Sequence, residues 1–325
     1  MVGYRPAGRL SKGHRGLAQF VKGARLVITS VPQSSVEPAR RWKRVAVTGA
    51  SGFVGSHLVQ RLQTAGVEVL ELSRSRGFDV CRDELPLEGV DRIFHLAGLT
   101  GVPSAWEQPL NFFETNALGT MRVLDQCRRH GCAITFLSAY IYGLPRHLPI
   151  AEDHPVSANN PYAFSKRIAE EVCDFFVQYY GVSCVTLRLF NTYGPLQSPD
   201  FLVPFIVGQI LDRGQPTVEV KDLAPKRDYI YIDDVIDAIL ATSTAPSGSV
   251  FNIGSGFAYS VEEIIQAAMA AAGVEKPYRS IEQRRRNEID CVVADTTALR
   301  SATGWEPHIS LVTGLRKLIE SMGQP

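Results

Sequence analysis

Residues 43–62 read KRVAVTGASGFVGSHLVQRL, an apolar run that leads through a glycine-rich turn into a helical pattern. The run 43–48 is rich in β-branched residues and predicts a buried strand that ends at Gly49. Apolar side chains then recur at helical spacing, at Val54, Leu58, Val59 and Leu62. A side chain at Gly49 or Gly52 would keep a phosphate away from the main-chain N–H groups of such a turn. Strand, turn and helix in this order therefore predict a dinucleotide-binding unit.

The composition of the 325 residues is that of a globular protein, with 45% hydrophobic and 21% charged residues. It excludes a disordered, fibrous or disulfide-scaffold protein. No apolar run reaches the roughly 20 residues that a membrane helix needs, so we expect no membrane partner. The six cysteines include no C-x-x-C pair, which indicates neither a zinc site nor a redox dithiol. We therefore expect no metal, and small buried thiols in a reducing cytoplasm.

Positive charge is concentrated near the N-terminus. Residues 1–44 hold ten Lys and Arg against one acid, Glu37, which leaves 24 of the 34 basic and 32 of the 33 acidic residues for the rest of the chain. A body this acidic does not coat nucleic acid, so we expect no nucleic-acid partner. Residues 1–42 keep no helical or alternating pattern, and we interpret them as a poorly ordered basic N-terminal extension. A targeting peptide or a nucleic-acid arm is the alternative for this segment.

The residues after the second predicted strand, 67–72, bear on the choice of cofactor. An acid at this point would bind both ribose hydroxyls of NAD and repel a 2′-phosphate. The chain has Ser73 and Arg74 there, followed by Ser75 and Arg76. Because a hydroxyl and guanidinium groups suit a phosphate, the sequence favours NADP over NAD. The alternative is that the arginines only solvate a loop.

Further strands alternate with helical stretches. We expect a buried strand at 92–98, a helix over 116–129 and a fourth strand at 133–137. This alternation predicts an α/β fold, a Rossmann-type doubly wound parallel sheet with a smaller, mostly C-terminal α/β substrate lobe. His95 lies inside an apolar strand, and we expect it to be a packing residue.

A hydroxyl, a phenol and an amine follow the fourth strand. Tyr162 and Lys166 are four residues apart and share one helix face. A free tyrosine has a pKa of about 10 and is a poor base at neutral pH. A lysine one turn away, beside a cationic nicotinamide, stabilises the phenolate and makes Tyr162 a usable acid or base. Ser138, at the end of the strand, is placed to hydrogen-bond the substrate oxygen.

The sequence resembles an extended short-chain dehydrogenase/reductase, the NAD-dependent epimerase/dehydratase family that acts on nucleotide sugars. The resemblance runs from about Arg44 to the C-terminus. Its signatures are Thr48-Gly49-x-x-Gly52-x-x-Gly55, His95-Leu96-Ala97-Gly98, Asn116-x-x-Gly119-Thr120, Ser138-x-x-x-Tyr142-Gly143, Tyr162-x-x-x-Lys166, Arg188-Leu189-Phe190-Asn191-x-Tyr193-Gly194-Pro195, Arg227-Asp228-Tyr229-x-x-Ile232-x-Asp234 and Phe251-Asn252-Ile253-Gly254-Ser255-Gly256.

This resemblance implies an enzyme and assigns its site residues. Catalysis falls to Ser138, Tyr162 and Lys166. Together with Ser73 and Arg74, the NADP or NAD cofactor is held by Gly49, Gly52, Phe53, Val54, Gly55, Asp79, Val80, Leu96, Ala97, Gly98, Asn116, Tyr162, Lys166 and Phe190. The substrate, with its nucleoside diphosphate, is held by Ser138, Asn191, Leu202, Arg227 and Arg285, with Arg284 or Arg286 in place of Arg285 if the alignment shifts by one residue. For Arg227, a salt bridge to Asp228 or Asp233 is the alternative.

Departures from the family narrow the reaction. The 4,6-dehydratases carry an acid directly after the catalytic hydroxyl, and the UDP-glucuronate decarboxylases usually do, whereas this chain has Ala139 and Tyr140. GDP-fucose synthase needs a His after the Asn-x-Tyr-Gly-Pro segment, and residues 197–204 contain none. Hydride transfer at C4 of a nucleotide-linked hexose remains. A 4-ketosugar reductase is slightly favoured, a 4-epimerase with tightly bound NAD is the alternative, and a non-catalytic NAD(P)-sensing protein comes third.

We expect residues 43–191 to form the NAD(P)-binding Rossmann domain, with 218–245 returning to it. Residues 192–217 and 246–325 are expected to form the nucleotide-sugar-binding lobe, with a capping box over 260–263. By analogy with the family, we expect a homodimer that forms through the helices of 115–129 and 162–180.

Overall fold

The computed structural model describes residues 42–283 and 288–323. Its largest sheet has six strands, all parallel. In spatial order they are β2 (Glu68–Leu72), β1 (Arg44–Thr48), β3 (Arg92–His95), β4 (Ala133–Ala139), β5 (Cys184–Leu189) and β9 (Val250–Ile253). The strand order reverses between β1 and β3, which is the point where doubly wound sheets bind their ligands. The predicted Rossmann-type fold is confirmed.

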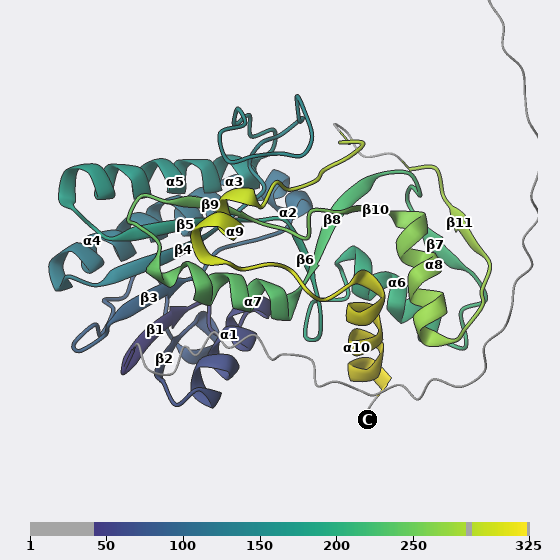
Figure 1. Cartoon of the computed structure of the whole chain (residues 1–325), viewed down its shortest axis with the longest axis horizontal. Helices are drawn as coiled ribbons and strands as arrows, with labels where there is room; N and C mark the ends of the chain where they lie inside the picture. Colours follow the sequence, from purple (N-terminus) through teal and green to yellow (C-terminus); the bar gives the residue numbers. More distant parts are fainter. Residues whose placement is uncertain (1–41, 284–287, 324–325) are drawn as a thin grey trace, which may run out of the picture. The chain divides into compact units, whose positions relative to one another are not determined.

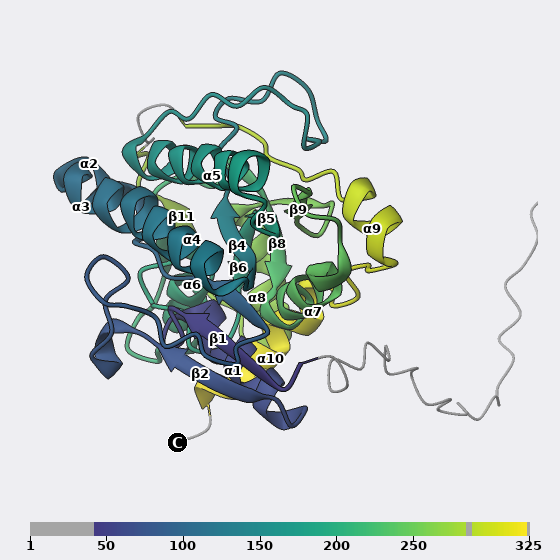
Figure 2. The same ribbon diagram turned by 90° about the vertical axis from the view of Figure 1, so that its left-hand side faces the viewer.

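Helices cover both faces of this sheet (Figures 1 and 2). Helices α4 (Gly119–His130) and α5 (Pro161–Tyr180) pack together on one face, and α1 (Phe53–Thr64) and α7 (Ile232–Ala241) pack together on the other. Because both faces are covered, β1 and the central strand β4 are nearly continuous buried runs rather than alternating ones. The predicted helix 116–129 begins inside a π-helix, η3 (Phe113–Leu118), which follows α2 (Val102–Glu107) and α3 (Pro109–Phe112).

Within the described residues, the smaller lobe that we predicted to bind the substrate contains two small sheets and three longer helices. One sheet joins β10 (Ala258–Ser260), β8 (Lys226–Tyr231) and β6 (Asn191–Tyr193), and the other pairs β11 (Tyr278–Ser280) with β7 (Val218–Val220). The helices are α6 (Leu202–Leu211), α8 (Val261–Ala272) and α10 (Leu311–Gly323), and α8 packs against both of the others. The predicted capping box is present, since Ser260 and Glu263 each bond the other's main chain.

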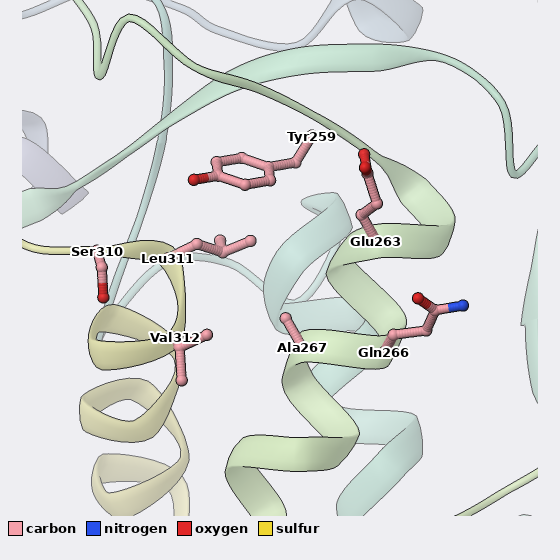
Figure 3. Close-up of a pocket in the computed structure, with 7 residues that line it drawn as sticks. All are labelled: Tyr259, Glu263, Gln266, Ala267, Ser310, Leu311 and Val312. Carbon is pink, nitrogen blue, oxygen red and sulfur yellow. The ribbon is translucent and has the colours of Figure 1, made fainter. Parts of the chain in front are cut away.

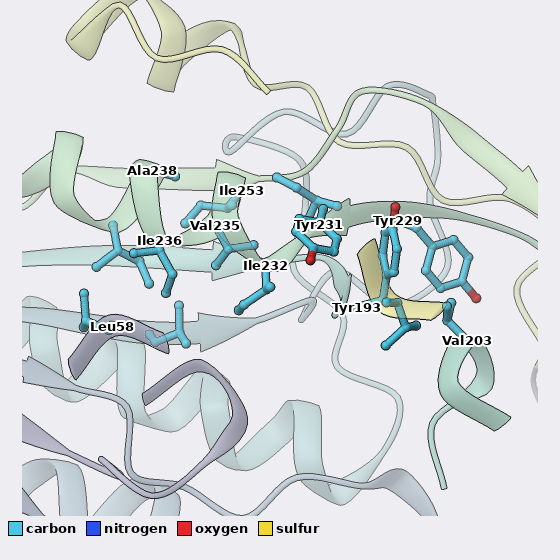
Figure 4. Close-up of a cluster of buried hydrophobic side chains, with 14 of the residues drawn as sticks. Leu58, Tyr193, Val203, Tyr229, Tyr231, Ile232, Val235, Ile236, Ala238 and Ile253 are labelled. Carbon is cyan, nitrogen blue, oxygen red and sulfur yellow. The ribbon is translucent and has the colours of Figure 1, made fainter. Parts of the chain in front are cut away.

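A continuous hydrophobic cluster joins the main sheet to the lobe (Figure 4). Leu58, Val235 and Ile236 come from the helices under the sheet, whereas Tyr231 and Val203 belong to the same cluster in the lobe. All five side chains are at most 3% exposed. The two parts of the chain therefore share a core, and the described residues belong to a single unit.

The structure corrects the predicted domain boundaries in two places. Strands β7 and β8 pair inside the lobe, so within 218–245 it is α7 that packs against the Rossmann helix α1. Strand β9, which we assigned to the lobe, is the edge strand of the main sheet beside β5. Strand partners far apart in sequence decide this assignment, and local pattern does not reveal them. The predicted extension 1–42 lies outside the described residues except for Trp42, whose ring packs edge-on against Phe94. Within the described ranges, none of the helices has the length and apolarity for a membrane span.

Candidate active site

The glycine turn between β1 and α1 is closely packed. Gly49 has φ +72°, and a Cβ there would lie 2.7 Å from the main-chain nitrogen of Ala97. A Cβ on Gly55 would lie 2.1 Å from the carbonyl oxygen of Gly49. In the described part of the chain no side chain caps the start of α1 at Gly52. The first N–H groups of α1 thus remain available for an anion, and the turn fits the diphosphate of a dinucleotide.

The end of β2 carries the residues predicted to select the cofactor. Ser73 is buried, and Arg74 donates from Nη2 to Thr115 Oγ1 at 3.0 Å and lies 3.4 Å from Asp79. A hydrogen bond from the main chain of Cys81 lowers the pKa of Asp79, and Arg74 adds to this effect. Arg76 pairs with Glu71 at 2.7 Å. Both arginine side chains are more than half exposed and already have carboxylate neighbours.

Asn116 ties the loop after β3 to helix α5. Its side chain accepts from the Leu99 N–H at 2.8 Å and donates to Ser165 Oγ at 2.9 Å. A Cβ on Gly98 would lie 3.0 Å from Asn116 Oδ1 and 3.2 Å from Lys166 Nζ. A side chain at Gly98 would therefore crowd the space beside Lys166. The resemblance assigns both residues to cofactor binding.

Lys166 of α5 bonds the main chain of β4 at Leu137, the residue before Ser138. Lys166 donates from Nζ to the carbonyl oxygen of Leu137 at 2.8 Å, and burial lowers the pKa of Lys166 to about 8. Ser138 is 4% exposed, and its Oγ has no hydrogen-bond partner among the described residues. Buried hydroxyl groups are usually paired, so an unpaired one is a feature that a bound ligand would explain.

Tyr162 lies in the first turn of α5, one helical turn before Lys166. Asn160 caps this helix by accepting from the Ala163 N–H at 2.9 Å, which sets where the helix begins. The ring of Tyr162 packs edge-on against Phe112. Burial raises the pKa of Tyr162 to about 12. In the chain alone the phenol is thus harder to ionise than a free tyrosine.

Several motif residues have structural roles. His95 is fully buried between Thr48 and Thr120, and burial lowers its pKa to about 3, so it stays neutral as a packing residue. Arg188 forms a buried pair with Glu170 of α5 at 2.8 Å. It also donates to the hydroxyl of Tyr142, which in turn donates to Asn252 of β9. This network joins β5, α5 and β9. It gives the buried hydroxyl of Tyr142 both a donor and an acceptor, so Tyr142 has a structural role.

Three of the predicted substrate residues lie in the lobe and Arg285 lies outside the described residues. Asn191 begins β6, Leu202 begins α6, and Arg227 lies on β8, the strand next to β6. Arg227 pairs with Glu288 and also donates to the carbonyl oxygen of Ile289. Its expected alternative partners have other roles. Asp228 accepts from the main chain of the 255–256 turn, and Asp233 pairs with Lys317.

Sequence reasoning missed two features of this region. The first is Glu288, the partner of Arg227, whose side chain is only 9% exposed. The available sequence signal for this ion pair was an acidic residue three positions after Arg285. The second is that Thr192 Oγ1 and Gln197 Oε1 are buried without a hydrogen-bond partner in the described ranges. No sequence pattern predicts this.

A pocket of about 340 Å³ opens between α8 and α10 (Figure 3). It contains none of the predicted site residues, since it is lined by Tyr259, Glu263, Gln266, Ala267, Ser310, Leu311 and Val312. Because Lys166 bonds β4 next to Ser138, we place the candidate site at the main sheet rather than in this pocket.

Comparison with known proteins gives matches along most of the chain. The family model described as the NAD dependent epimerase/dehydratase family matches residues 45–254. The chain is similar to the UDP-glucose 4-epimerase of Mycolicibacterium smegmatis, with 31% identity over 85% of this chain and 97% of the relative. It is also similar to the GDP-6-deoxy-D-mannose reductase of Pseudomonas aeruginosa, with 32% identity over 85% of this chain and 96% of the relative.

The solved structure of RMD from Pseudomonas aeruginosa complexed with NADPH has the same fold, with a TM-score of 0.79 and 32% identity over 86% of this chain and 98% of that one. The matched residues include the glycine turn and the hydroxyl, phenol and amine of the candidate site. The chain therefore belongs to the NAD dependent epimerase/dehydratase family, the extended short-chain dehydrogenase/reductase enzymes that act on nucleotide sugars.

Proposed function

We propose that this enzyme transfers hydride at C4 of a hexose linked to a nucleoside diphosphate, and that it works as a 4-ketosugar reductase. The observation that carries the proposal is the buried, unpaired hydroxyl of Ser138 beside the carbonyl group that Lys166 holds. A bound sugar oxygen would give this hydroxyl the partner that it lacks. The relatives named for UDP-glucose and for GDP-6-deoxy-D-mannose support a nucleotide sugar as substrate.

The chain's own residues handle the proton. Ser138 orients the C4 oxygen by a hydrogen bond, and Tyr162 gives a proton to that oxygen or takes one from it. Lys166, one helical turn from Tyr162, is proposed to contribute a positive charge that favours the phenolate and opposes the burial that raises the pKa of Tyr162. When bound, the nicotinamide cofactor supplies or accepts the hydride.

The residues after Ser138 argue against elimination. Elimination of water needs an acid or base beside the reacting carbons, and Ala139 has none. Tyr140 donates its hydroxyl to the carbonyl oxygen of Gly143 at 2.5 Å, and burial raises its pKa. This phenol is therefore committed to the main chain, which supports a reductase or an epimerase over a dehydratase.

The cofactor is NADP or NAD, and we propose NADP. Ser73 and Arg74 follow β2, where an acid would repel a 2′-phosphate, and the similar structure from Pseudomonas aeruginosa holds NADPH. The side chain of Arg74 is about half exposed, and Asp79 lies 3.4 Å from its guanidinium group. A 2′-phosphate would compete with Asp79 for this group, which the ion pair already orients.

The second candidate function is a 4-epimerase that retains NAD, which the similarity to UDP-glucose 4-epimerase favours. A non-catalytic NAD(P) sensor comes third, because such a protein would have no use for Ser138, Tyr162 and Lys166 together. Asn191, Leu202 and Arg227, with Arg285, are proposed to hold the nucleoside diphosphate, and Arg227 would then exchange Glu288 for phosphate oxygens.

The experiment is to release and identify the cofactor of the purified protein, and then to screen UDP, GDP, dTDP and CDP sugars. An empty protein that oxidises NADPH only with a 4-ketosugar supports the reductase, whereas tightly held NAD⁺ with interconversion of C4 epimers supports the epimerase. Tyr162→Phe should abolish either activity, and unchanged turnover in this variant would refute the enzyme mechanism. Leu144→Ala, at a side chain 70% exposed outside the proposed site, is the matched control.

We also propose a homodimer formed through α4 and α5. These helices expose a set of apolar side chains that a partner copy would bury, namely Met121, Phe164, Phe175 and Tyr179. Light scattering after gel filtration should give twice the mass of 35.7 kDa, and Phe175→Asp should shift the protein toward the monomer.

A further inference from the structure

Three buried side-chain oxygen atoms lack a hydrogen-bond partner in the part of the chain that the structure describes. They are Ser138 Oγ, Thr192 Oγ1 and Gln197 Oε1. A buried polar atom without a partner destabilises a fold, so a bound ligand or an ordered water is needed to complete its bonding. The proposed function accounts for Ser138, whereas Thr192 and Gln197 have no role so far.

Thr192 and Gln197 lie together at the end of β6. Gln197 donates from Nε2 to the carbonyl oxygen of Thr192 at 2.9 Å, which uses the amide nitrogen and leaves Oε1 free. Turning the amide over would place two acceptors against each other, so this contact fixes its orientation. Thr192 itself pairs with Ile230 of the neighbouring strand β8, which fixes its main chain.

The turn that joins these two residues is strained and closely packed. Leu196 has φ +67°, a left-handed conformation that a leucine rarely adopts, and its side chain is 77% exposed. Packing of that side chain therefore does not explain the strain. On the inner side, a Cβ on Gly194 would lie 2.5 Å from Ile232 Cγ2, a residue of the cluster in Figure 4, and 3.6 Å from Phe53. Strained turns of this kind persist where the surroundings hold them, often at ligand sites.

The turn also lies between the two parts of the candidate site. On one side Gly194 approaches Phe53, the first residue of the helix that follows the glycine turn. On the other side are Asn191, on the same strand as Thr192, and Leu202 at the start of α6. This turn therefore lies within the stretch of chain that links the glycine turn to the predicted substrate residues of β6 and α6.

We propose that Thr192 and Gln197 form a subsite for a hydroxyl group of a bound sugar ring, an inference that rests on the proposed function. Gln197 Oε1 can only accept a hydrogen bond, whereas the Thr192 hydroxyl can donate one. A sugar hydroxyl donates to the first and accepts from the second. A phosphate at neutral pH offers acceptors only and would face the lone pairs of Gln197 Oε1, so the diphosphate is excluded. The hexose of the nucleotide sugar and a ribose of the cofactor share this chemistry.

Thr192→Val tests the subsite because valine keeps the shape and removes the hydroxyl. Since that hydroxyl is unpaired, the melting temperature without ligand should stay the same or rise, while affinity for the ligand should fall about 3- to 30-fold. Gln197→Met should weaken the same ligand. Thr242→Val is the matched control, because Thr242 is buried and donates to the carbonyl oxygen of Ile239. It should lower the melting temperature and leave affinity unchanged.

Calorimetric titrations with NADPH, UDP-glucose, UDP, GDP-mannose and GDP distinguish the two sources. Weaker binding of the nucleotide sugars but not of free UDP or GDP identifies the hexose, and weaker binding of NADPH identifies the cofactor ribose. The subsite is refuted if both variants bind every probe as the wild type does, or if Thr192→Val melts as early as Thr242→Val. These binding measurements need no turnover, so they stand apart from the activity screen on which the proposed function depends.

Discussion

Replacing Lys166 by methionine should change how the stability of this enzyme depends on pH. Lys166 is 4% exposed, and burial lowers its pKa from 10.5 to about 8. Methionine fills a similar volume without a charge. The variant therefore removes the cost of burying an ammonium group, and with it the hydrogen bond to the carbonyl oxygen of Leu137.

The size of the effect follows from the two pKa values. Between about pH 8 and 10.5 the unfolded chain keeps the proton of Lys166 while the folded chain loses it, so wild-type stability rises with pH across this window. At roughly 1.4 kcal/mol for each pH unit, the buried charge costs the folded state about 3 kcal/mol below pH 8. The lost hydrogen bond costs the variant about 1–3 kcal/mol at every pH. At pH 7 the two effects nearly cancel, whereas near pH 10.5 the variant should be the less stable protein.

Urea denaturation of both proteins at pH values from 7 to 10.5 measures this difference. The free energy of unfolding of the variant minus that of the wild type should fall by about 3 kcal/mol across the series. A difference that stays constant with pH would refute the reasoning, because it would mean that Lys166 keeps its proton in the folded state. Lys43→Met is the control, since Lys43 is exposed and its ammonium group is already hydrated.

Three further predictions follow from the site and its support. Gly49→Ala, at φ +72° and 2.7 Å from the nitrogen of Ala97, should destabilise the fold by at least about 1 kcal/mol and abolish NADPH binding in a fluorescence titration; unchanged binding would contradict the role of the turn. Glu170→Gln leaves the charge of Arg188 buried without its charged partner. The free energy of unfolding measured in urea should therefore fall by about 3 kcal/mol. Arg74→Ala should weaken NADPH about 10-fold in calorimetry and leave NADH unchanged if the enzyme prefers NADP.

Local pattern was sufficient to predict the elements that carry the candidate catalytic and glycine-turn residues. The β-branched run before Gly49 and the apolar spacing after it predicted β1 and α1, because a strand and a helix differ in the period of their buried side chains. The spacing of Tyr162 and Lys166 predicted that they share one face of a helix, and α5 contains both. Their catalytic roles, and those of the cofactor and substrate residues, stay predictions.

Pairing between distant parts of the chain was not predictable in the same way. Strand β9 lies beside β5 in the main sheet although about 60 residues separate them, and Arg227 pairs with Glu288 across a similar distance in sequence. Such contacts depend on which surfaces the tertiary structure brings together, and the sequence around each residue does not predict them.

The sequence by itself was enough to predict a doubly wound sheet with a dinucleotide turn, and to nominate a hydroxyl, a phenol and an amine as catalytic candidates, because glycine turns and helical spacing act over a few residues. Only the tertiary structure decided what surrounds those groups. Burial lowers the pKa of Lys166 to about 8 and raises that of Tyr162 to about 12. It also leaves the oxygens of Ser138, Thr192 and Gln197 unpaired in the described chain. Desolvation and hydrogen bonding depend on every element packed around a side chain, and those elements come from the whole length of the chain.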